Sequence, residues 1–327
     1  MKRLLTIALC TLPFLAAQAQ DATKAIRESA PLSAADSTGK EWVRGGIFNI
    51  NLTQVSLTNW AAGGFNSIGG IAQFNAFANR HKGKYVWDNS IALAFGGQML
   101  AAQGTGFGDS NPIKTDDRIE LNSKWGRELK KPWYFSALGQ FKTQFTEGFD
   151  ASNNRISNLF APAYLILAVG LDYRPNDNFT VFISPAALKV TMVNDKSLFG
   201  GSTDKDLRVF GVKNGSTTEV EVGGYLRAQY KADLAKNFSF LTRGDLYSNY
   251  LRNPQNIDVT WETLWTLKIT DWFAASFNTL LLYDHDIDVP KLKDVVDPIT
   301  NTTVKVPNPG PGTQFKQTLG IGLTWKL

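Results

Sequence analysis

Cysteine and histidine are almost absent from this chain. Cysteine occurs once, at Cys10, and histidine occurs twice, at His81 and His285. A disulfide framework or a cysteine–histidine metal site needs more of these residues. The sequence also contains no phosphate-binding loop, no dinucleotide fingerprint and no HExxH motif, so we expect no cofactor.

Long apolar runs are also missing beyond the first twenty residues. The longest one, FAPAYLILAVGL at 160–171, is shorter than the roughly 18 residues that a membrane-spanning helix requires. The mean hydropathy of −0.17 is far too low for a bundle of such helices. A polytopic helical membrane protein is therefore excluded, whereas neutral hydropathy with 12% aromatic residues suits a β-barrel.

The first residues have the pattern of a secretory signal peptide. Lys2 and Arg3 precede an apolar stretch at 4–17, and Ala17-Gln18-Ala19 forms a small-x-small cleavage site. Cleavage there would remove the only cysteine.

Three regions follow from this interpretation. We expect a signal peptide at 1–19, a flexible periplasmic lead-in at 20–44 and one β-barrel at 45–327. The net charge of +5 comes from scattered Lys and Arg and not from a basic stripe. We therefore expect no nucleic-acid partner, and contact of these cations with anionic lipid head groups instead.

The stretch 133–145 shows the pattern on which the fold prediction depends. Side chains of a strand alternate between its two faces. One face would carry Trp133, Phe135, Ala137, Gly139, Phe141, Thr143 and Phe145. The other would carry Tyr134, Ser136, Leu138, Gln140, Lys142 and Gln144. This segment is longer than the usual strand of roughly 5–6 residues, and matches the roughly 9–11 residues of a tilted membrane-spanning strand.

Similar alternation recurs along the rest of the chain. The segments are 46–55, 67–80, 85–98, 118–126, 133–145, 163–174, 179–190, 219–231, 238–250, 258–269, 272–284 and 315–327. The fold class that we predict is therefore all-β: a transmembrane, antiparallel, up-and-down β-barrel of about 12 strands.

The connections between these segments alternate in length. Short ones lie at 81–84, 127–132, 174–178, 231–237 and 268–271. Longer ones lie at 99–117, 146–162, 191–218 and 285–312, with briefer ones near 56–66 and 251–257. Short periplasmic turns opposite long extracellular loops are typical of barrels in the bacterial outer membrane, where we place this chain. The last five residues, LTWKL, resemble the signal read by the barrel-insertion machinery, which we expect as a partner together with outer-membrane lipid.

The first of the longer connections carries a recognisable motif. It reads QVSLTNWAAGGFNSIGG, and its most specific residues are Asn59, Trp60, Gly63 and Gly64. The segment resembles the signature of a Bacteroidetes outer-membrane β-barrel family catalogued as domain of unknown function 3078. The resemblance implies the fold and the localisation, and it implies no activity.

Charged residues of both signs occupy the polar face of the predicted strands. We expect the following side chains to line the lumen: Arg118, Glu120, Lys124, Gln140, Lys142, Asp172, Arg174, Glu219, Glu221, Arg227, Arg243, Asp245 and Glu262. Such a lumen can be packed by ion pairs or can form a narrow aqueous path. We expect a non-enzymatic barrel that passes or binds small hydrophilic solutes, and its oligomeric state stays open. A structural barrel that engages a partner through its long loops is the first alternative.

A surface hydrolase is the second alternative. Asp116-Asp117 and Asp284-His285 lie at the predicted extracellular end, in a pattern that resembles the rim of omptin-type surface proteases, although the spacings differ. An aspartate beside a histidine can orient it as a general base. Asp284, Asp286 and Asp288 also form a weak Ca²⁺ candidate, which lacks the glycine of an EF-hand loop. For both sets, a solvated acidic rim is the simpler interpretation.

Overall fold

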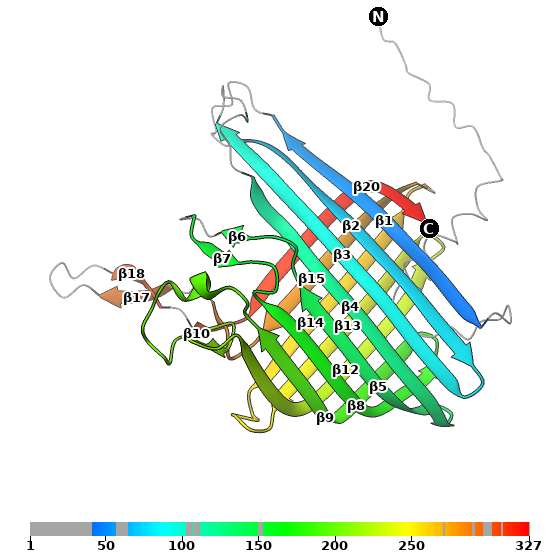
Figure 1. Cartoon of the computed structure of the whole chain (residues 1–327). Coiled ribbons are helices and arrows are strands. Elements are labelled where there is room, and N and C mark those ends of the chain that lie inside the picture. The colour runs from blue at the N-terminus through cyan, green and yellow to red at the C-terminus, as the bar shows by residue number, and fades with distance from the viewer. Residues whose placement is uncertain are drawn as a thin grey trace, which may run out of the picture.

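The fold is a closed, all-antiparallel barrel of twelve strands, seen in a computed structural model (Figure 1). The structure describes residues 41–56, 65–102, 107, 112–149, 153–270, 272–289, 292–296, 303–308 and 310–326. Within these ranges no helix is long and apolar enough to cross a membrane. The predicted signal peptide, most of the predicted lead-in and the motif from Asn59 to Gly64 lie outside the described residues.

Consecutive strands of the barrel wall are neighbours in space. The wall consists of β1 (Trp42–Val55), β2 (Phe65–Lys82), β3 (Tyr85–Ala102), β4 (Ile113–Lys130), β5 (Trp133–Thr143), β8 (Ala163–Asn176), β9 (Phe179–Met192), β12 (Thr218–Ala235), β13 (Phe238–Asn249), β14 (Ile257–Lys268), β15 (Phe273–Tyr283) and β20 (Gln314–Lys326). β1 pairs with β20 and closes the ring. The predicted fold class is confirmed.

The remaining elements are small and lie in the long connections. They are β6 (Gly148–Phe149), β7 (Arg155–Ser157), η1 (Lys196–Phe199), β10 (Arg208–Val209), β11 (Val212–Lys213), β16 (Asp288–Val289), β17 (Leu292–Val296), β18 (Thr303–Pro307) and β19 (Gly310–Pro311). In Figure 1 they gather at the end of the barrel opposite the short turns, so the predicted asymmetry of the connections is confirmed.

Several strands are longer than the sequence pattern predicted. β4 begins at Ile113, ahead of the predicted start at Arg118, and β3 extends to Ala102. In these outer parts the backbone ladder continues through sequence without alternation, apolar on both faces at 99–102 and mostly polar at 113–117. Alternation of hydrophobicity marks only the part of a strand that separates lipid from lumen, so it misses these extensions.

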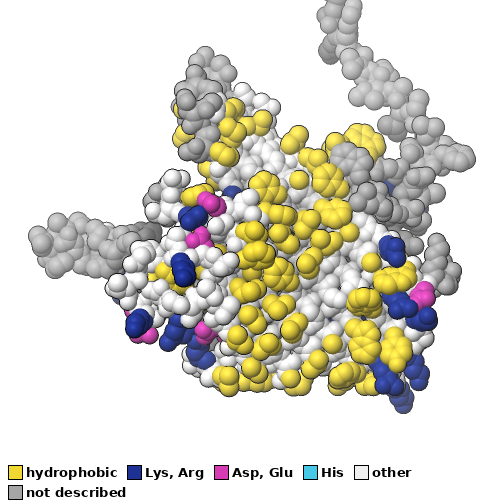
Figure 2. Space-filling view, viewed as in Figure 1, with side chains coloured by type: hydrophobic (Ala, Val, Ile, Leu, Met, Phe, Trp, Pro, Cys, Tyr) yellow, Lys and Arg dark blue, Asp and Glu magenta, His cyan; other side chains and the backbone are white. Residues whose placement is uncertain are grey.

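The two faces of β5 confirm the predicted register. Trp133 and Phe135 are 41% and 46% exposed on the outer surface, whereas Ser136 and Leu138 are 0% and 3% exposed in the interior. A slip of one residue would exchange these sets. On the side of the molecule shown in Figure 2, hydrophobic side chains cover the outer surface of the strands, and Lys and Arg gather where the short turns lie.

Aromatic rings on the outer surface pack in pairs near the short turns. The ring centroids of Tyr85 and Trp125 are 5.8 Å apart, and those of Trp133 and Tyr173 are 4.8 Å apart. Amphipathic rings of this kind prefer the boundary between lipid and water. They mark the periplasmic edge of the membrane-spanning belt.

The junction between the first and last strands is the shortest in the wall. β1 pairs with β20 only over Ile47–Asn51, opposite 322–326, whereas it pairs with β2 along its whole length from Trp42 to Val55. Gly322 is required there because a Cβ atom would lie 2.0 Å from the carbonyl oxygen of Ile50.

A matched pair of arginine substitutions tests which face of the wall meets lipid. Ala137 faces outward near the middle of β5, and Ala274 faces the interior beside a cavity. We expect Ala137→Arg to lower the free energy of unfolding by about 2–4 kcal/mol, because it places a charge in hydrocarbon. Ala274→Arg should cost much less. Urea unfolding in lipid vesicles, followed by tryptophan fluorescence, measures both, and the reverse order would show that the faces are misassigned.

Candidate functional site

The interior of the barrel is crossed by ion pairs. The predicted lumen residues take interior positions on their strands, and all but Gln140 and Lys142 form ion pairs there within the described chain. Gln140 contributes hydrogen bonds instead. Apart from the pairs of Glu219 with Arg208 and Arg252, these contacts fall into three groups along the barrel axis.

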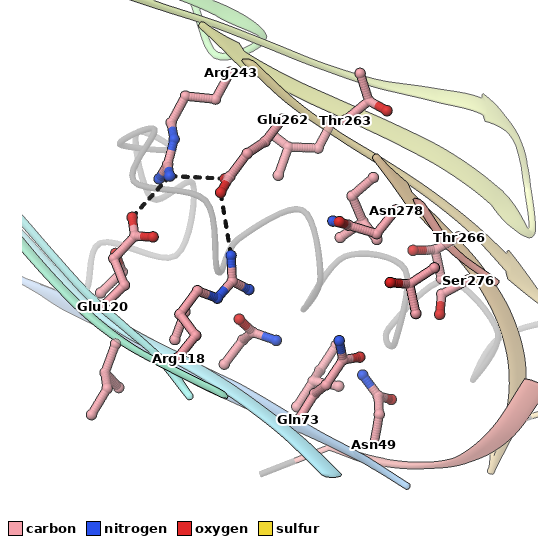
Figure 3. A pocket seen from close by; sticks show the side chains of 18 of the residues that line it. Asn49, Gln73, Arg118, Glu120, Arg243, Glu262, Thr263, Thr266, Ser276 and Asn278 are labelled. Carbon is pink, nitrogen blue, oxygen red and sulfur yellow. Dashed lines mark hydrogen bonds and ion pairs between the residues drawn. The ribbon is translucent and has the colours of Figure 1, made fainter. Parts of the chain in front are cut away.

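The middle group, which we call the central belt, consists of Arg118, Glu120, Asn122, Gln140, Arg227, Arg243, Asp245 and Glu262. Arg243 lies 2.9 Å from the carboxylate of Glu120 and 2.8 Å from that of Glu262. Arg118 reaches Glu262 at 3.2 Å. Figure 3 shows Arg118 and Glu120 on one side of the lumen and Arg243 and Glu262 on the other. Since β4 and β13 are five places apart in the ring of twelve, the central belt ties opposite walls together.

Amide side chains complete the central belt. Gln140 donates hydrogen bonds to Glu120 at 3.2 Å and to Asn122 at 2.9 Å. Arg227 donates to Asp245 at 2.6 Å and to Asn122 at 3.2 Å, again across the lumen. Paired and hydrogen-bonded charges can be buried at acceptable cost, whereas unpaired ones cannot. The contacts hold the belt in one arrangement.

A second group, the periplasmic cluster, lies nearer the short turns. It consists of Asp88, Lys124, Asp172 and Arg174. Asp172 accepts from Lys124 at 2.8 Å and from Arg174 at 2.6 Å, and Arg174 also lies 2.9 Å from Asp88. Asp88 and Asp172 are 0% exposed. The lumen is therefore filled by charge at this level too.

The third group lies toward the long loops and is centred on Lys189 of β9. Its ammonium lies 2.6 Å from Asp258, 3.2 Å from Asp284 and 3.4 Å from Glu221. Arg252 also reaches Glu221, at 3.8 Å, whereas Asp258 and Asp284 share Lys189 as their one ion-pair partner among the described residues, so this wall has a surplus of negative charge.

Lys189 is not among the lumen residues predicted from the alternation of the sequence, and a bulge in β9 explains why. Ser184 and Ala187 are both buried, because the register against the neighbouring strands shifts between them. The bulge packs against Gly170, where a Cβ atom would lie 2.0 Å from the carbonyl oxygen of Ile183. A strict two-residue alternation loses its phase at such a bulge. The single charged residue in the apolar run AALKVTM was the available signal.

A cavity of about 470 Å³ lies above the central belt, toward the long loops. We call it the vestibule. Its lining combines charged residues with aliphatic and aromatic ones, including Tyr164, Ile166, Leu280 and Leu282. Its volume is in the range of small-molecule binding sites.

A smaller cavity of about 140 Å³ lies on the other side of the belt. Uncharged polar groups line much of it, among them Asn49, Gln73, Ser276 and Asn278 (Figure 3). Arg118, Glu120 and Glu262 line both cavities. The central belt is therefore the partition between two chambers of one lumen.

The predicted hydrolase residues are engaged in separate contacts. Asp116 pairs with Lys316 at 2.9 Å, and Asp117 pairs with Lys114 at 2.9 Å. Asp284 pairs with Lys189, and His285 lies 3.3 Å from the hydroxyl of Tyr283. Within the described ranges no contact joins Asp116 or Asp117 to Asp284 or His285. These four residues do not form a dyad of acid and base.

The carboxylates of the predicted Ca²⁺ site also have separate partners. Asp284 binds Lys189, and Asp286 lies 3.0 Å from Arg252. The side chain of Asp288 lies outside the described residues. In the part of the chain that the structure describes, no group of three or more His, Cys, Asp or Glu side chains could hold a metal ion.

The closed ladder, the apolar outer surface and the polar lumen define the class of this protein. An even-stranded antiparallel barrel with a lipid-facing belt is the architecture of the bacterial outer membrane, and the chain is a barrel of that membrane. The family resemblance of the motif at 59–64 is confirmed. The family described as "Protein of unknown function (DUF3078)" matches residues 52–149. A second family, "Protein of unknown function, DUF481", matches residues 190–306.

Solved structures of other outer-membrane proteins show a distant likeness. The translocator domain of autotransporter NalP from Neisseria meningitidis is 9% identical, with 95% of this chain and 98% of that chain covered and a TM-score of 0.38. The COG4313 outer membrane channel from Pseudomonas putida F1 is 10% identical, with 91% and 98% covered and a TM-score of 0.38. The NanC porin is 8% identical, with 85% and 98% covered and a TM-score of 0.35. No curated protein matches the sequence. Likeness at this level carries no argument about function.

A pair of carboxylate-to-amide substitutions tests the contribution of the periplasmic cluster. We expect Asp172→Asn to lower the free energy of unfolding by about 3–5 kcal/mol, because Lys124 and Arg174 lose their shared, fully buried counterion. The control is Glu147→Gln, which breaks an exposed ion pair with Arg155 and should cost about 0–1 kcal/mol. Urea unfolding in detergent micelles measures both values. Equal, small losses would mean that the cluster adds nothing to stability.

Proposed function

We propose that this outer-membrane barrel binds a small solute in the vestibule and admits it to the lower chamber only when the central belt rearranges. The observation that carries the proposal is the partition itself. Two cavities, of about 470 Å³ and about 140 Å³, meet at the same three charged residues, Arg118, Glu120 and Glu262. The protein is in this view a gated barrel with a binding site at its outer end.

The contacts of the belt support gating over permanent closure. The side chain of Arg118 is 31% exposed and that of Glu262 is 19% exposed, so water reaches the pair from a cavity. Ion pairs that contact water exchange partners at a lower cost than fully buried ones. Glu120, in contrast, is held by Arg243, Asn122 and Gln140 at 2% exposure. The Arg118–Glu262 side of the belt is therefore the part that opens.

The long loops support a second candidate function, in which a partner binds the extracellular end. Ala161, Val193, Phe199 and Val212 form a small apolar core of their own there. Arg155 of β7 ties this region together through Asp195 at 3.3 Å, and the hydroxyl and backbone of Ser197 hold the pKa of Asp195 below its usual range. An ordered loop surface is a suitable docking surface. Replacement of 196–215 by a Gly-Ser linker should abolish capture of such a partner from solubilised outer membranes and leave solute binding intact.

Single-channel recording tests the gate directly. We expect the refolded wild-type protein to show low conductance in a planar lipid bilayer, because the central belt spans the lumen. Arg243→Ala removes the side chain that joins Glu120 to Glu262, and should raise the conductance several-fold and favour cations. Arg155→Ala, in the loops, is the control and should leave the conductance unchanged.

Two results would contradict the gate. One is a wild-type barrel that already conducts as freely as the Arg243→Ala variant. The other is an unchanged conductance in that variant while the barrel is intact, which slower migration of boiled than of unboiled samples on gel electrophoresis would verify.

A further inference from the structure

The lining of the vestibule differs from that of an ordinary aqueous pore. Lumen-facing positions in water-filled barrels are polar. Here five apolar or aromatic side chains face the cavity from three strands: Tyr164 and Ile166 of β8, Tyr247 of β13, and Leu280 and Leu282 of β15. An apolar surface of this kind, with a few charged groups around it, fits a ligand that has an apolar body.

The floor of the vestibule carries one more cation than its carboxylates neutralise. The central belt forms this floor and pairs its three arginines, Arg118, Arg227 and Arg243, with the carboxylates Glu120, Asp245 and Glu262. Lys142, which lines the vestibule beside the belt, is the additional cation. Lys142 forms no ion pair within 4.0 Å and no hydrogen bond with any residue that the structure describes. Its ammonium group faces the vestibule from β5.

The opposite wall carries the reverse surplus. Asp258 and Asp284 both line the vestibule, and within the described residues Lys189 is the one cation that pairs with either of them. Asp284 is the more weakly held of these two, at 3.2 Å from Lys189 against 2.6 Å for Asp258. The vestibule therefore has a positive group at its floor on β5 and a negative group at its wall where β15 ends.

We propose that the vestibule takes a small zwitterion with an apolar body, of which a short peptide with apolar side chains is the fitting example. Its carboxylate would pair with Lys142, its ammonium with Asp284, and its side chains would pack on Ile166, Leu280 and Leu282. The inference rests on the proposed solute-binding function and names the class of solute. An ion pair at each end of the ligand also fixes the orientation in which the ligand binds.

Peptides that differ by one charge test this assignment. The probes are Leu-Phe, its C-terminal amide, its N-acetyl derivative and Gly-Gly, titrated into the purified barrel in detergent by calorimetry. We expect Leu-Phe to bind at least tenfold more tightly than each of the other three, because each lacks one of the three features that the vestibule recognises.

Two substitutions assign each charge to its residue. Lys142→Gln should weaken the binding of Leu-Phe about tenfold and leave the binding of its amide unchanged. Asp284→Asn should remove the preference for the free amine over the acetylated one, while Lys189 keeps its other two carboxylates. Lys130→Gln, which changes an exposed lysine at the other end of the barrel, is the control and should have no effect.

The outcomes separate this inference from the proposed gate. Equal binding of all four probes, or equal losses for Leu-Phe and its amide in Lys142→Gln, would overturn the zwitterion site even if Arg243→Ala opens the pore. Charge-dependent binding together with an unresponsive conductance would retain the site and overturn the gate.

Discussion

The need to satisfy every backbone N–H and C=O group in hydrocarbon is the constraint on which this structure depends. A sheet can meet it only by closing on itself, since an open edge would leave a row of unpaired groups in lipid. Closure makes every strand two-sided, with lipid outside and an enclosed space inside. The apolar outer face and the mostly polar inner face of β5 follow from that one requirement. The aromatic pairs near the short turns mark where the requirement ends and water begins.

The enclosed space is then occupied by side chains, and in this chain many of them are charged and form ion pairs. A twelve-stranded ring is too wide for side chains of one wall to close it by apolar contact alone. Long side chains such as Arg243 of β13 reach across: Arg243 meets Glu120 on the opposite wall and also Glu262 on the adjacent strand β14. The result is a partition that is stable only as a set, because removal of one charge leaves its partner unpaired in a low dielectric.

The sequence was sufficient to predict the fold and to predict which face of most strands meets lipid, because the alternation of apolar and polar residues follows the contrast between lipid and lumen. It was not sufficient where the position of a side chain depends on a bulge or on contacts between strands. Because of the bulge at Ser184–Ala187, a fixed period of two residues along β9 assigns Lys189 to the wrong face of the strand. The burial of Gln140 in the central belt likewise arises from its contacts with Glu120 and Asn122 on the neighbouring strand β4. The pairing of Asp284 with Lys189, and not with His285, likewise depends on which walls face each other. Such contacts join residues far apart in the sequence, and no spacing rule encodes them.

The brief ladder between β1 and β20 has a mechanical consequence. Every other junction of the wall is held by a longer run of paired residues, so the chain's two terminal strands form the joint with the fewest hydrogen bonds to break. A ring under radial load parts at its weakest joint. This barrel would therefore open between β1 and β20 into a curved sheet, with the hydrogen bonds of the remaining eleven junctions intact. The same joint unites the first and the last strand of the wall in chain order, and Gly322 lets β20 seat against β1 without a side chain in the way.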